Sequence, residues 1–340
     1  MLGVRGLATG IGSLPCKETG KALDLVFKYV PQVPFWPQLP RRDAHEGMVM
    51  QFMQHIAAIP QSQDADRQLE QFYEKVTQKD INYFQITQDY ANGLYAFKER
   101  LQADPVLLKN IEYIKCNITG PFTAGASIKD EDGKAYIYDN VVMQVLIEGL
   151  SMKALWQVDF FKEFNKKIIM FIDEPYLGCF GSAYTPLNRE DVVRVLTELT
   201  EKIKTRETLI GVHCCGNTDW SIFTDIKTID IINFDAYGFM DKFVLYASNI
   251  DAFLKRGGVI CWGVVPTQEF TGKETAQGLV DRIKDGVEIL VKKGVDRKLL
   301  VENMLISPAC GLGSLDAGRA EDILNLLSQA SAILQKGPLK

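Results

Sequence analysis

Three residues in this sequence have side chains that could bind one metal ion. His213 and Cys215 follow an apolar stretch, residues 209–212, that is typical of a buried strand. Because side chains alternate along a strand, residues 213 and 215 face the same side and offer an imidazole and a thiol to one ion. Cys310 stands far downstream, in a segment rich in glycine. One histidine and two cysteines form a donor set that suits zinc.

The same residues also allow a structural interpretation, in which a buried histidine and two cysteines only pack in the core. Cys214 lies between the first two expected ligands and should point the other way, into packing. Asp235 ends a later strand, where it is either a fourth, oxygen ligand or a carboxylate that caps the next helix. A catalytic zinc keeps three protein ligands and one exchangeable position, so both roles of Asp235 stay open.

This donor set indicates a reaction class. Two thiolates and a neutral imidazole make a zinc site electron-rich, and such a site binds a substrate thiol as its thiolate, which is the nucleophilic form. The expected chemistry is therefore transfer of an alkyl group, such as methyl, to sulfur. Hydrolysis by zinc-bound hydroxide is the competing class, but it more often uses ligand sets rich in histidine and carboxylate.

Eight stretches are expected to form strands, and each is followed by a helix. Near-continuous apolar runs are typical of parallel strands that are buried on both faces. Eight such units favour a single-domain (β/α)₈ TIM barrel, of the α/β class, over residues 1–340. A doubly wound open sheet is the alternative, but no Gly-x-Gly-x-x-Gly follows the first strand. The expected strands are 7–12, 80–87, 112–119, 166–172, 208–213, 230–235, 258–264 and 299–306.

The residues that could do chemistry fall at the carboxyl ends of these strands, where a barrel of this kind has its active site. Gly12 and Ser13 follow the first strand and offer a hydroxyl and backbone N–H groups to a substrate carboxylate. Asp173 follows the fourth strand and could bind a substrate ammonium group, whereas its neighbour Glu174 should point elsewhere. The four prolines of residues 31–42 predict an irregular loop near this end.

Composition limits the classes of partner. The net charge is −5, so no basic field is expected to hold nucleic acid or an anionic membrane. Apolar runs are too short to predict a transmembrane helix, and the N-terminus lacks the pattern of a secretory signal. Seven cysteines, an odd number spread over the chain, argue against a disulfide framework. A reducing cytoplasm is therefore the expected location.

These motifs resemble the superfamily that contains uroporphyrinogen decarboxylase and cobalamin-independent methionine synthase, over nearly the whole chain. The pair His213-x-Cys215 with the later Cys310-Gly is similar to the zinc motif of the synthase catalytic domain, and Asp235 matches the position of an acidic residue that takes part there. The segments 11–13 and 173–175 resemble that family's homocysteine-binding segments. Residues 213–218 also resemble a motif of the corrinoid-dependent zinc methyltransferases that methylate coenzyme M.

The resemblance implies a zinc-dependent methyltransferase whose acceptor is a small thiol, homocysteine or a coenzyme M-like compound. The segment 80–87 leads to no counterpart of the acidic residue with which the synthase holds the homocysteine amine. The additional N-terminal barrel of the synthase is also lacking, so a methylcorrinoid carried by a partner protein is the expected methyl donor. Two alternatives stay open: a metal-free enzyme that resembles uroporphyrinogen decarboxylase and acts on a tetrapyrrole, and a non-catalytic protein that binds a corrinoid or a thiol.

Overall fold

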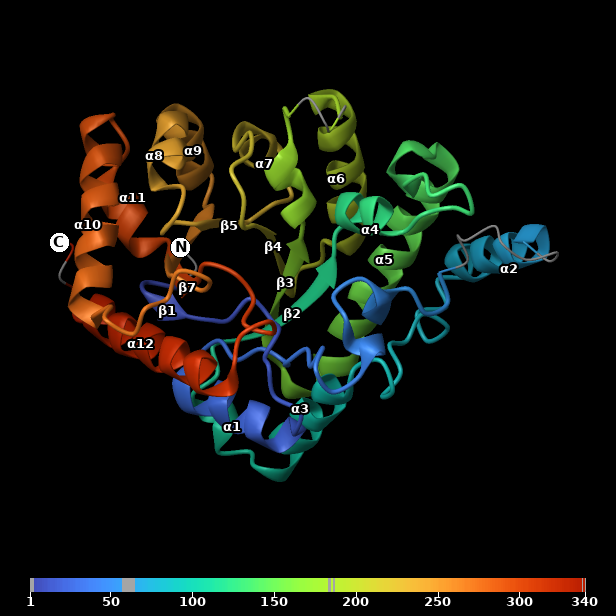
Figure 1. The fold of residues 1–340 in the computed structure, drawn as a ribbon, viewed down its shortest axis with the longest axis horizontal. Helices are drawn as coiled ribbons and strands as arrows, with labels where there is room; N and C mark the ends of the chain where they lie inside the picture. The colour runs from blue at the N-terminus through green and yellow to red at the C-terminus, as the bar shows by residue number, and fades with distance from the viewer. Residues whose placement is uncertain (1–2, 57–64, 183–184, 186, 338, 340) are drawn as a thin grey trace.

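The structure is a computed structural model, and it describes the chain except residues 1–2, 57–64, 183–184, 186, 338 and 340. In the described residues, seven parallel strands form one curled sheet with helices along its outer side (Figure 1). The expected α/β class is confirmed, and the curl resembles part of a TIM barrel. The strands, in the spatial order β1-β7-β6-β5-β4-β3-β2, are β1 (Leu7–Ala8), β2 (Tyr113–Thr119), β3 (Lys167–Asp173), β4 (Thr208–Cys214), β5 (Ile231–Asp235), β6 (Val259–Val265) and β7 (Met304–Pro308).

The expectation of eight strands is wrong for the described residues. The segment 80–87 forms turns, because Asp80 accepts hydrogen bonds from the Lys75 ammonium and the Tyr83 backbone and so favours a local bend. The expected strand 299–306 begins later than predicted. Its first half belongs to a short helix, which starts where the Asp296 side chain accepts from the backbone N–H of Leu299.

The proline-rich segment 32–38 lies between the two edge strands, β1 and β2. On one side the Lys115 backbone N–H, in β2, donates to Pro34 O at 2.9 Å. On the other side the Gln38 N–H donates to Gly12 O, just beyond β1, at 3.0 Å. Prolines have no N–H to donate, so the segment makes isolated bridges and no regular ladder. The sequence predicted a loop here, and in the structure this loop lies next to both edge strands of the sheet.

The helices surround the outer face of the sheet, with α2 at the periphery beyond α5 (Figure 1). Several long helices begin at a side chain that accepts a backbone N–H of the first turn, as Asp139, Asn188, Thr275 and Asp316 do. The helices are α1 (Thr19–Tyr29), α2 (Ala65–Thr77), α3 (Asn92–Ala103), α4 (Pro121–Ser127), α5 (Asn140–Phe161), α6 (Arg189–Ile203), α7 (Ser221–Asp225), α8 (Met240–Phe243), α9 (Ala247–Lys255), α10 (Ala276–Lys292), α11 (Arg297–Glu302) and α12 (Ala317–Gln335).

Helix α5 is long and apolar enough to cross a membrane by length and composition alone. An 18-residue window within residues 140–164 has a mean hydropathy of 1.2, and 72% of that window is buried inside the protein. The helix packs against β2, α4 and α6. Among the described residues no other helix meets these criteria. A helix buried in a protein core meets these criteria equally well, so the packing of α5 explains its apolar composition.

Lys153 is a fully buried lysine on α5, and it gives the first testable prediction. Its Nζ donates to the carbonyl oxygens of Phe84 and Gln85 at 3.3 and 3.5 Å, and burial lowers its pKa to about 7. The unfolded chain therefore binds more protons between about pH 7 and the usual lysine pKa, and stability should rise with pH across this window. Lys153→Met should stabilise the protein at pH 6 by roughly 1–3 kcal/mol, and the gain should shrink by pH 10.

Urea unfolding at both pH values measures this difference. Lys21→Met, at an exposed lysine of α1 that pairs with Glu18, serves as the control and should change stability little. A Lys153→Met gain that stays constant from pH 6 to pH 10 would show that the buried charge is not its source.

The core has two parts, on the two faces of the sheet. The larger one fills the space between the strands and the surrounding helices. The smaller part lies inside the curl of the sheet, towards the amino ends of the strands. Its members include Leu7, Ile169, Phe171, Ile231 and Leu305. The sheet therefore forms a packed apolar base, and the polar residues described below lie at its other end.

Candidate metal centre

A row of polar side chains crosses four neighbouring strands at the carboxyl end of the sheet. In the strand register, Thr119 pairs with Asp173, Asp173 with His213, and His213 with Asn233. Residues paired across parallel strands point to the same face, so all four side chains lie inside the curl. Each is at least 96% buried, since the exposed fraction is 4% or less. The register alone therefore gathers a hydroxyl, a carboxylate, an imidazole and an amide.

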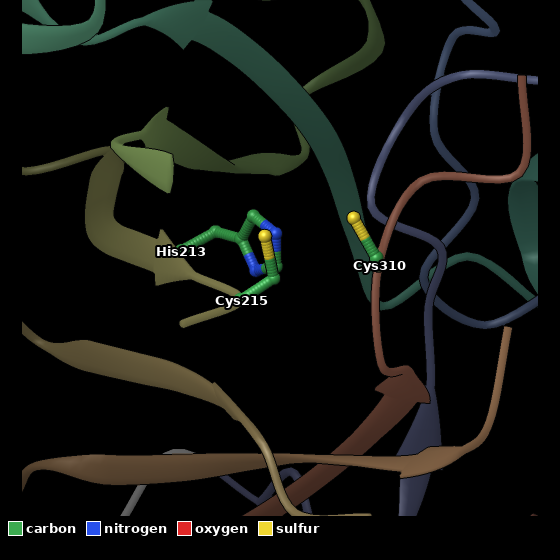
Figure 2. A group of neighbouring side chains, drawn as sticks. All are labelled: His213, Cys215 and Cys310. Atoms are coloured by element: carbon green, nitrogen blue, oxygen red, sulfur yellow. The ribbon is translucent and has the colours of Figure 1, made fainter. Parts of the chain in front are cut away.

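His213, Cys215 and Cys310 lie together at this end. One ligand atom from each lies within 4.8 Å of the other two. Figure 2 shows His213 and Cys215 side by side at the end of β4, with the Cys310 side chain facing them from the segment after β7. His213 is buried, and the two cysteines are partly buried. The structure thus brings Cys310 next to two residues that precede it by 95 and 97 positions in the sequence, as the resemblance implies.

The thiols of Cys215 and Cys310 shift each other's pKa in opposite directions. Hydrogen bonds from Cys215 and then from His213 hold the pKa of the Cys310 thiol well below its usual range, against the effect of burial. The same contact, helped by burial, raises the pKa of Cys215. The lowered pKa favours the thiolate form of Cys310. Zinc binds cysteine as the thiolate and histidine as the neutral imidazole, so this donor set fits zinc.

The imidazole of His213 uses its two nitrogens differently. Its Nδ1 is hydrogen bonded to Asn233 Oδ1, inside the sheet. Burial lowers the pKa of His213, but the hydrogen bond to Cys310 and the charges of Cys310 and Asp173 raise it more, so the net shift is upward. Because Nδ1 is occupied by Asn233, Nε2 is the nitrogen available to a metal ion.

A cavity of about 240 Å³ opens beside these three residues. Its size suits a small molecule better than a large cofactor. The wall also contains two residues that the sequence predicts as substrate-binding, Ser13 and Asp173. The lining residues are Ile11, Ser13, Gln38, Pro40, Glu46, Met48, Asp173, Pro175, His213, Cys215, Cys310, Gly311, Gly313 and Ser314.

Gly12 and Ser13 lie where the segment after β1 meets the segment that carries Cys310. The Ser13 hydroxyl oxygen accepts from the Gly313 N–H at 3.2 Å, and the Leu312 N–H donates to Ser13 O at 3.0 Å. Gly12 has a φ of +156°, and a Cβ there would come within 2.8 Å of Gln38 Oε1. A side chain at position 12 would therefore collide with the wall of the cavity.

Asp173 and Glu174 point in different directions, as their adjacency in sequence predicts. Asp173 lines the cavity, and its Oδ1 has no hydrogen-bond partner among the described residues. Burial raises its pKa, and the nearby Lys115 ammonium offsets part of that rise. Glu174 turns away and accepts from the backbone N–H groups of Phe122 and Thr123 at the start of α4, at 3.0 and 2.8 Å. Only Asp173 is thus available to a ligand.

Asp235 and Cys214 lie outside the group of three. Asp235 Oδ1 accepts from the Gly238 N–H at 2.7 Å, in the turn before α8, and no side chain caps α8 itself, so the expected helix cap does not form. Its role as a metal ligand stays a prediction. Cys214 is fully buried in the core between sheet and helices, where the sequence predicts it, and burial raises its pKa to about 12.

Some polar residues of the cavity wall, among them Glu46 and Gln38, are missing from the sequence prediction. Glu46 ends a short turn, Ala44–Glu46, and a second turn spans Met50–Phe52. Glu46 is fully buried and bonds to the Arg42 guanidinium and to the Leu39 N–H. A carboxylate four residues after an arginine, next to a proline-rich loop, was the available signal.

The loops after β3 and β4 touch through two glycines, which gives a second prediction. A Cβ at Gly178 would lie 2.9 Å from the Gly216 Cα, and a Cβ at Gly216 would lie 2.7 Å from the Gly178 Cα. Gly178→Ala should therefore push the backbone next to Cys215 outward, lower the stability by about 1–3 kcal/mol and weaken metal binding. Gly20→Ala, in α1, where a Cβ meets nothing within 4 Å and φ is not in the left-handed region, isolates the effect of the contact from that of losing a glycine.

Thermal unfolding and a zinc titration read out the two effects. A Gly178→Ala protein with the thermal stability and the zinc affinity of the wild type would mean that the loops can separate without moving Cys215.

Comparison with known proteins bears on this site. No known family profile matches the chain. The chain is 25% identical over 267 residues to the methionine synthase of Methanocaldococcus jannaschii, a match that covers 72% of this chain and 79% of that protein. The resemblance to methionine synthases is confirmed.

A solved structure adds a more distant likeness. It is a B12-independent methionine synthase from Shewanella sp. W3-18-1 in complex with selenomethionine, with a TM-score of 0.46 and 19% sequence identity. The match covers 66% of this chain and 62% of that one, so this chain spans less than two thirds of that protein.

Proposed function

We propose that this protein is a zinc-dependent methyltransferase that methylates the sulfur of homocysteine or a close relative. The observation that carries the proposal is the convergence of His213, Cys215 and Cys310 within 4.8 Å beside a cavity that also contains Asp173. The resemblance to methionine synthase supports the same reaction class. The transfer of a methyl group to a thiol needs a site that holds the thiol deprotonated, and a zinc ion on these three residues would meet this requirement.

In this proposal the imidazole Nε2 of His213 and the thiolates of Cys215 and Cys310 hold the zinc ion. The bound zinc supplies a positive charge that keeps a substrate thiol in its nucleophilic, deprotonated form at neutral pH. The remaining tasks fall to this chain's own side chains. The apolar base of the sheet lies below the cavity, and Pro40, Glu46 and Met48 form one side of its wall.

In this proposal Asp173 and Ser13 bind the ammonium and carboxylate groups of the acceptor. Asp173 offers an unpartnered carboxylate oxygen to an ammonium group, and Ser13 keeps its hydroxyl proton to donate to a carboxylate. Two carboxylates, Asp173 and Glu46, and no lysine or arginine line the described cavity. An aminothiol therefore fits better than a thiol that carries only a sulfonate, as coenzyme M does.

The methyl donor in this proposal is a methylcorrinoid on a partner protein, as expected from the sequence. Location in a reducing cytoplasm and a single domain over the whole chain are likewise part of the proposal. The free cysteines fit the location, because a reducing environment keeps thiols available as ligands. Methyl transfer to homocysteine, measured with methylcobalamin and in parallel with a methylated folate, identifies the donor.

The decarboxylase alternative is less well supported. A tetrapyrrole that carries several carboxylates requires a cationic site, and the described cavity wall has two acidic residues and no basic one. Formation of a decarboxylated porphyrin from uroporphyrinogen would revive this alternative.

The decisive measurement is the metal content of protein purified without chelator. About one zinc per chain together with methyl transfer to homocysteine is the expected result. Absence of zinc after anaerobic reduction and reconstitution would overturn the proposal. One zinc per chain without transfer from either donor would instead favour the non-catalytic thiol-binding protein.

A further inference from the structure

Asn233 is a buried polar residue to which the proposed reaction assigns no task. Its side chain is fully buried on β5, and it is paired in register with His213 of β4. The amide makes three hydrogen bonds. Oδ1 contacts His213 Nδ1, and Nδ2 donates to Cys261 O at 3.0 Å and to Ser307 Oγ at 2.9 Å. Every strand from β4 to β7 is thus connected through this one amide.

The two acceptors on β6 and β7 fix the orientation of the amide. Cys261 O is a backbone carbonyl and can only accept. Ser307 donates its own hydroxyl proton to Pro308 O at 2.8 Å, so its oxygen accepts from Asn233. Both contacts therefore require the NH₂ group of Asn233, and a flipped amide would set two carbonyl oxygens against each other.

This orientation decides which nitrogen of His213 carries the proton. Because the amide oxygen can only accept, the His213 Nδ1 must be the donor of their hydrogen bond. A neutral imidazole with its proton on Nδ1 has its lone pair on Nε2. Protein metal sites commonly fix a ligating histidine in this way, through an acceptor on the second ring nitrogen.

We propose that Asn233 is the positioning residue of the metal centre, which holds His213 in the Nδ1-protonated form with Nε2 facing the two cysteines. The inference rests on the proposed function, since it takes His213, Cys215 and Cys310 as the zinc ligands. The link through Ser307 and Pro308 also ties the histidine to the segment that carries Cys310. A neutral amide suits this place, because two thiolates already balance the charge of Zn²⁺ and the buried centre needs no further carboxylate.

Replacement of Asn233 by leucine tests the inference, because leucine has a similar volume and no acceptor. Zinc affinity, measured by competition with a chromophoric chelator, should fall by about 10- to 100-fold. Asn303→Leu is the matched control: Asn303 is also a buried asparagine, 1% exposed, but its amide donates only to Leu299 O. This control should lose stability without losing zinc affinity.

The tautomer itself is measurable without any variant. The chain contains three histidines, so nitrogen NMR of histidine-labelled protein resolves each ring. In zinc-free wild-type protein, at a pH where the ring is neutral, His213 should carry its proton on Nδ1, and zinc should then shift the Nε2 signal. A proton on Nε2 in the neutral ring would overturn the inference.

The outcomes separate the inference from the proposed function. Wild-type protein that binds no zinc contradicts the proposed function, while the tautomer measurement still tests Asn233. Wild-type protein that binds zinc, with equal affinity in Asn233→Leu, contradicts the inference alone. If Asn233→Leu does not fold, Ser307→Ala removes one of the two contacts that orient the amide and should weaken zinc binding several-fold. An unchanged affinity in that variant would count against the inference.

Discussion

Replacing Cys310 by serine should remove stoichiometric zinc and, with it, methyl transfer. A serine hydroxyl is not deprotonated at neutral pH and is a much poorer zinc ligand than a thiolate, so two protein ligands would remain where a catalytic site needs three. We expect zinc affinity to fall by well over 100-fold, more than the 10- to 100-fold typical of a residue that only supports a ligand. Metal analysis after gel filtration, followed by chelator competition, measures the loss.

Cys214→Ser is the matched control for this experiment. Cys214 is adjacent to a proposed ligand in sequence, yet its side chain packs in the core between sheet and helices. Its replacement should lower stability and leave the zinc content at one per chain. Circular dichroism of both variants verifies the fold. A Cys310→Ser protein that retains one tightly bound zinc would rule out the three-residue site.

Asp173→Asn should impair the binding of an aminothiol without removing zinc. The two side chains have nearly the same shape, but the amide cannot supply the negative charge that attracts a substrate ammonium group. Loss of a buried charge partner costs about 2–4 kcal/mol, so kcat/KM for homocysteine should fall roughly 100-fold, mainly through KM. Steady-state kinetics, together with the zinc content of the same preparation, measures both quantities.

A thiol without an amino group sharpens this test. Its reaction should be slow with the wild type and should change little in Asp173→Asn, because this thiol has no ammonium group to contact Asp173. Asp241→Asn, at an exposed carboxylate of α8 that pairs with Lys242, should leave the KM for homocysteine unchanged. An Asp173→Asn protein with the wild-type KM would remove Asp173 from the substrate site.

The convergence of His213, Cys215 and Cys310 was accessible from sequence, because it follows from two simple rules. Alternation along a strand places 213 and 215 on one side, and parallel strands bring their carboxyl ends to one edge. The divergence of Asp173 and Glu174 follows from the same alternation. Asn233 could also have been found in this way, since it stands two residues before Asp235 on the same face of the same strand.

The structures of segments 80–87 and 32–38 could not be predicted from these two rules. Residues 80–87 alternate in polarity as a strand would, but the Asp80 side chain stabilises a turn, which the pattern does not report. The segment 32–38 has prolines that exclude a regular ladder, yet non-local contacts with Gly12 and Lys115 hold it extended. Glu46 bonds to the Leu39 N–H and the Arg42 guanidinium beside this segment, so its place in the cavity wall follows from where the segment lies.

The contact between Ser13 and Gly313 joins residues that are 300 positions apart, and it has a consequence for how the protein matures. During synthesis the chain emerges from its N-terminus, so His213 and Cys215 are made long before Cys310. A nascent chain offers at most two of the three proposed ligands and lacks the strand that positions the third. Capture of a metal ion by all three proposed ligands would therefore require that β7 has joined β1 and β6, which would place metal loading late in folding.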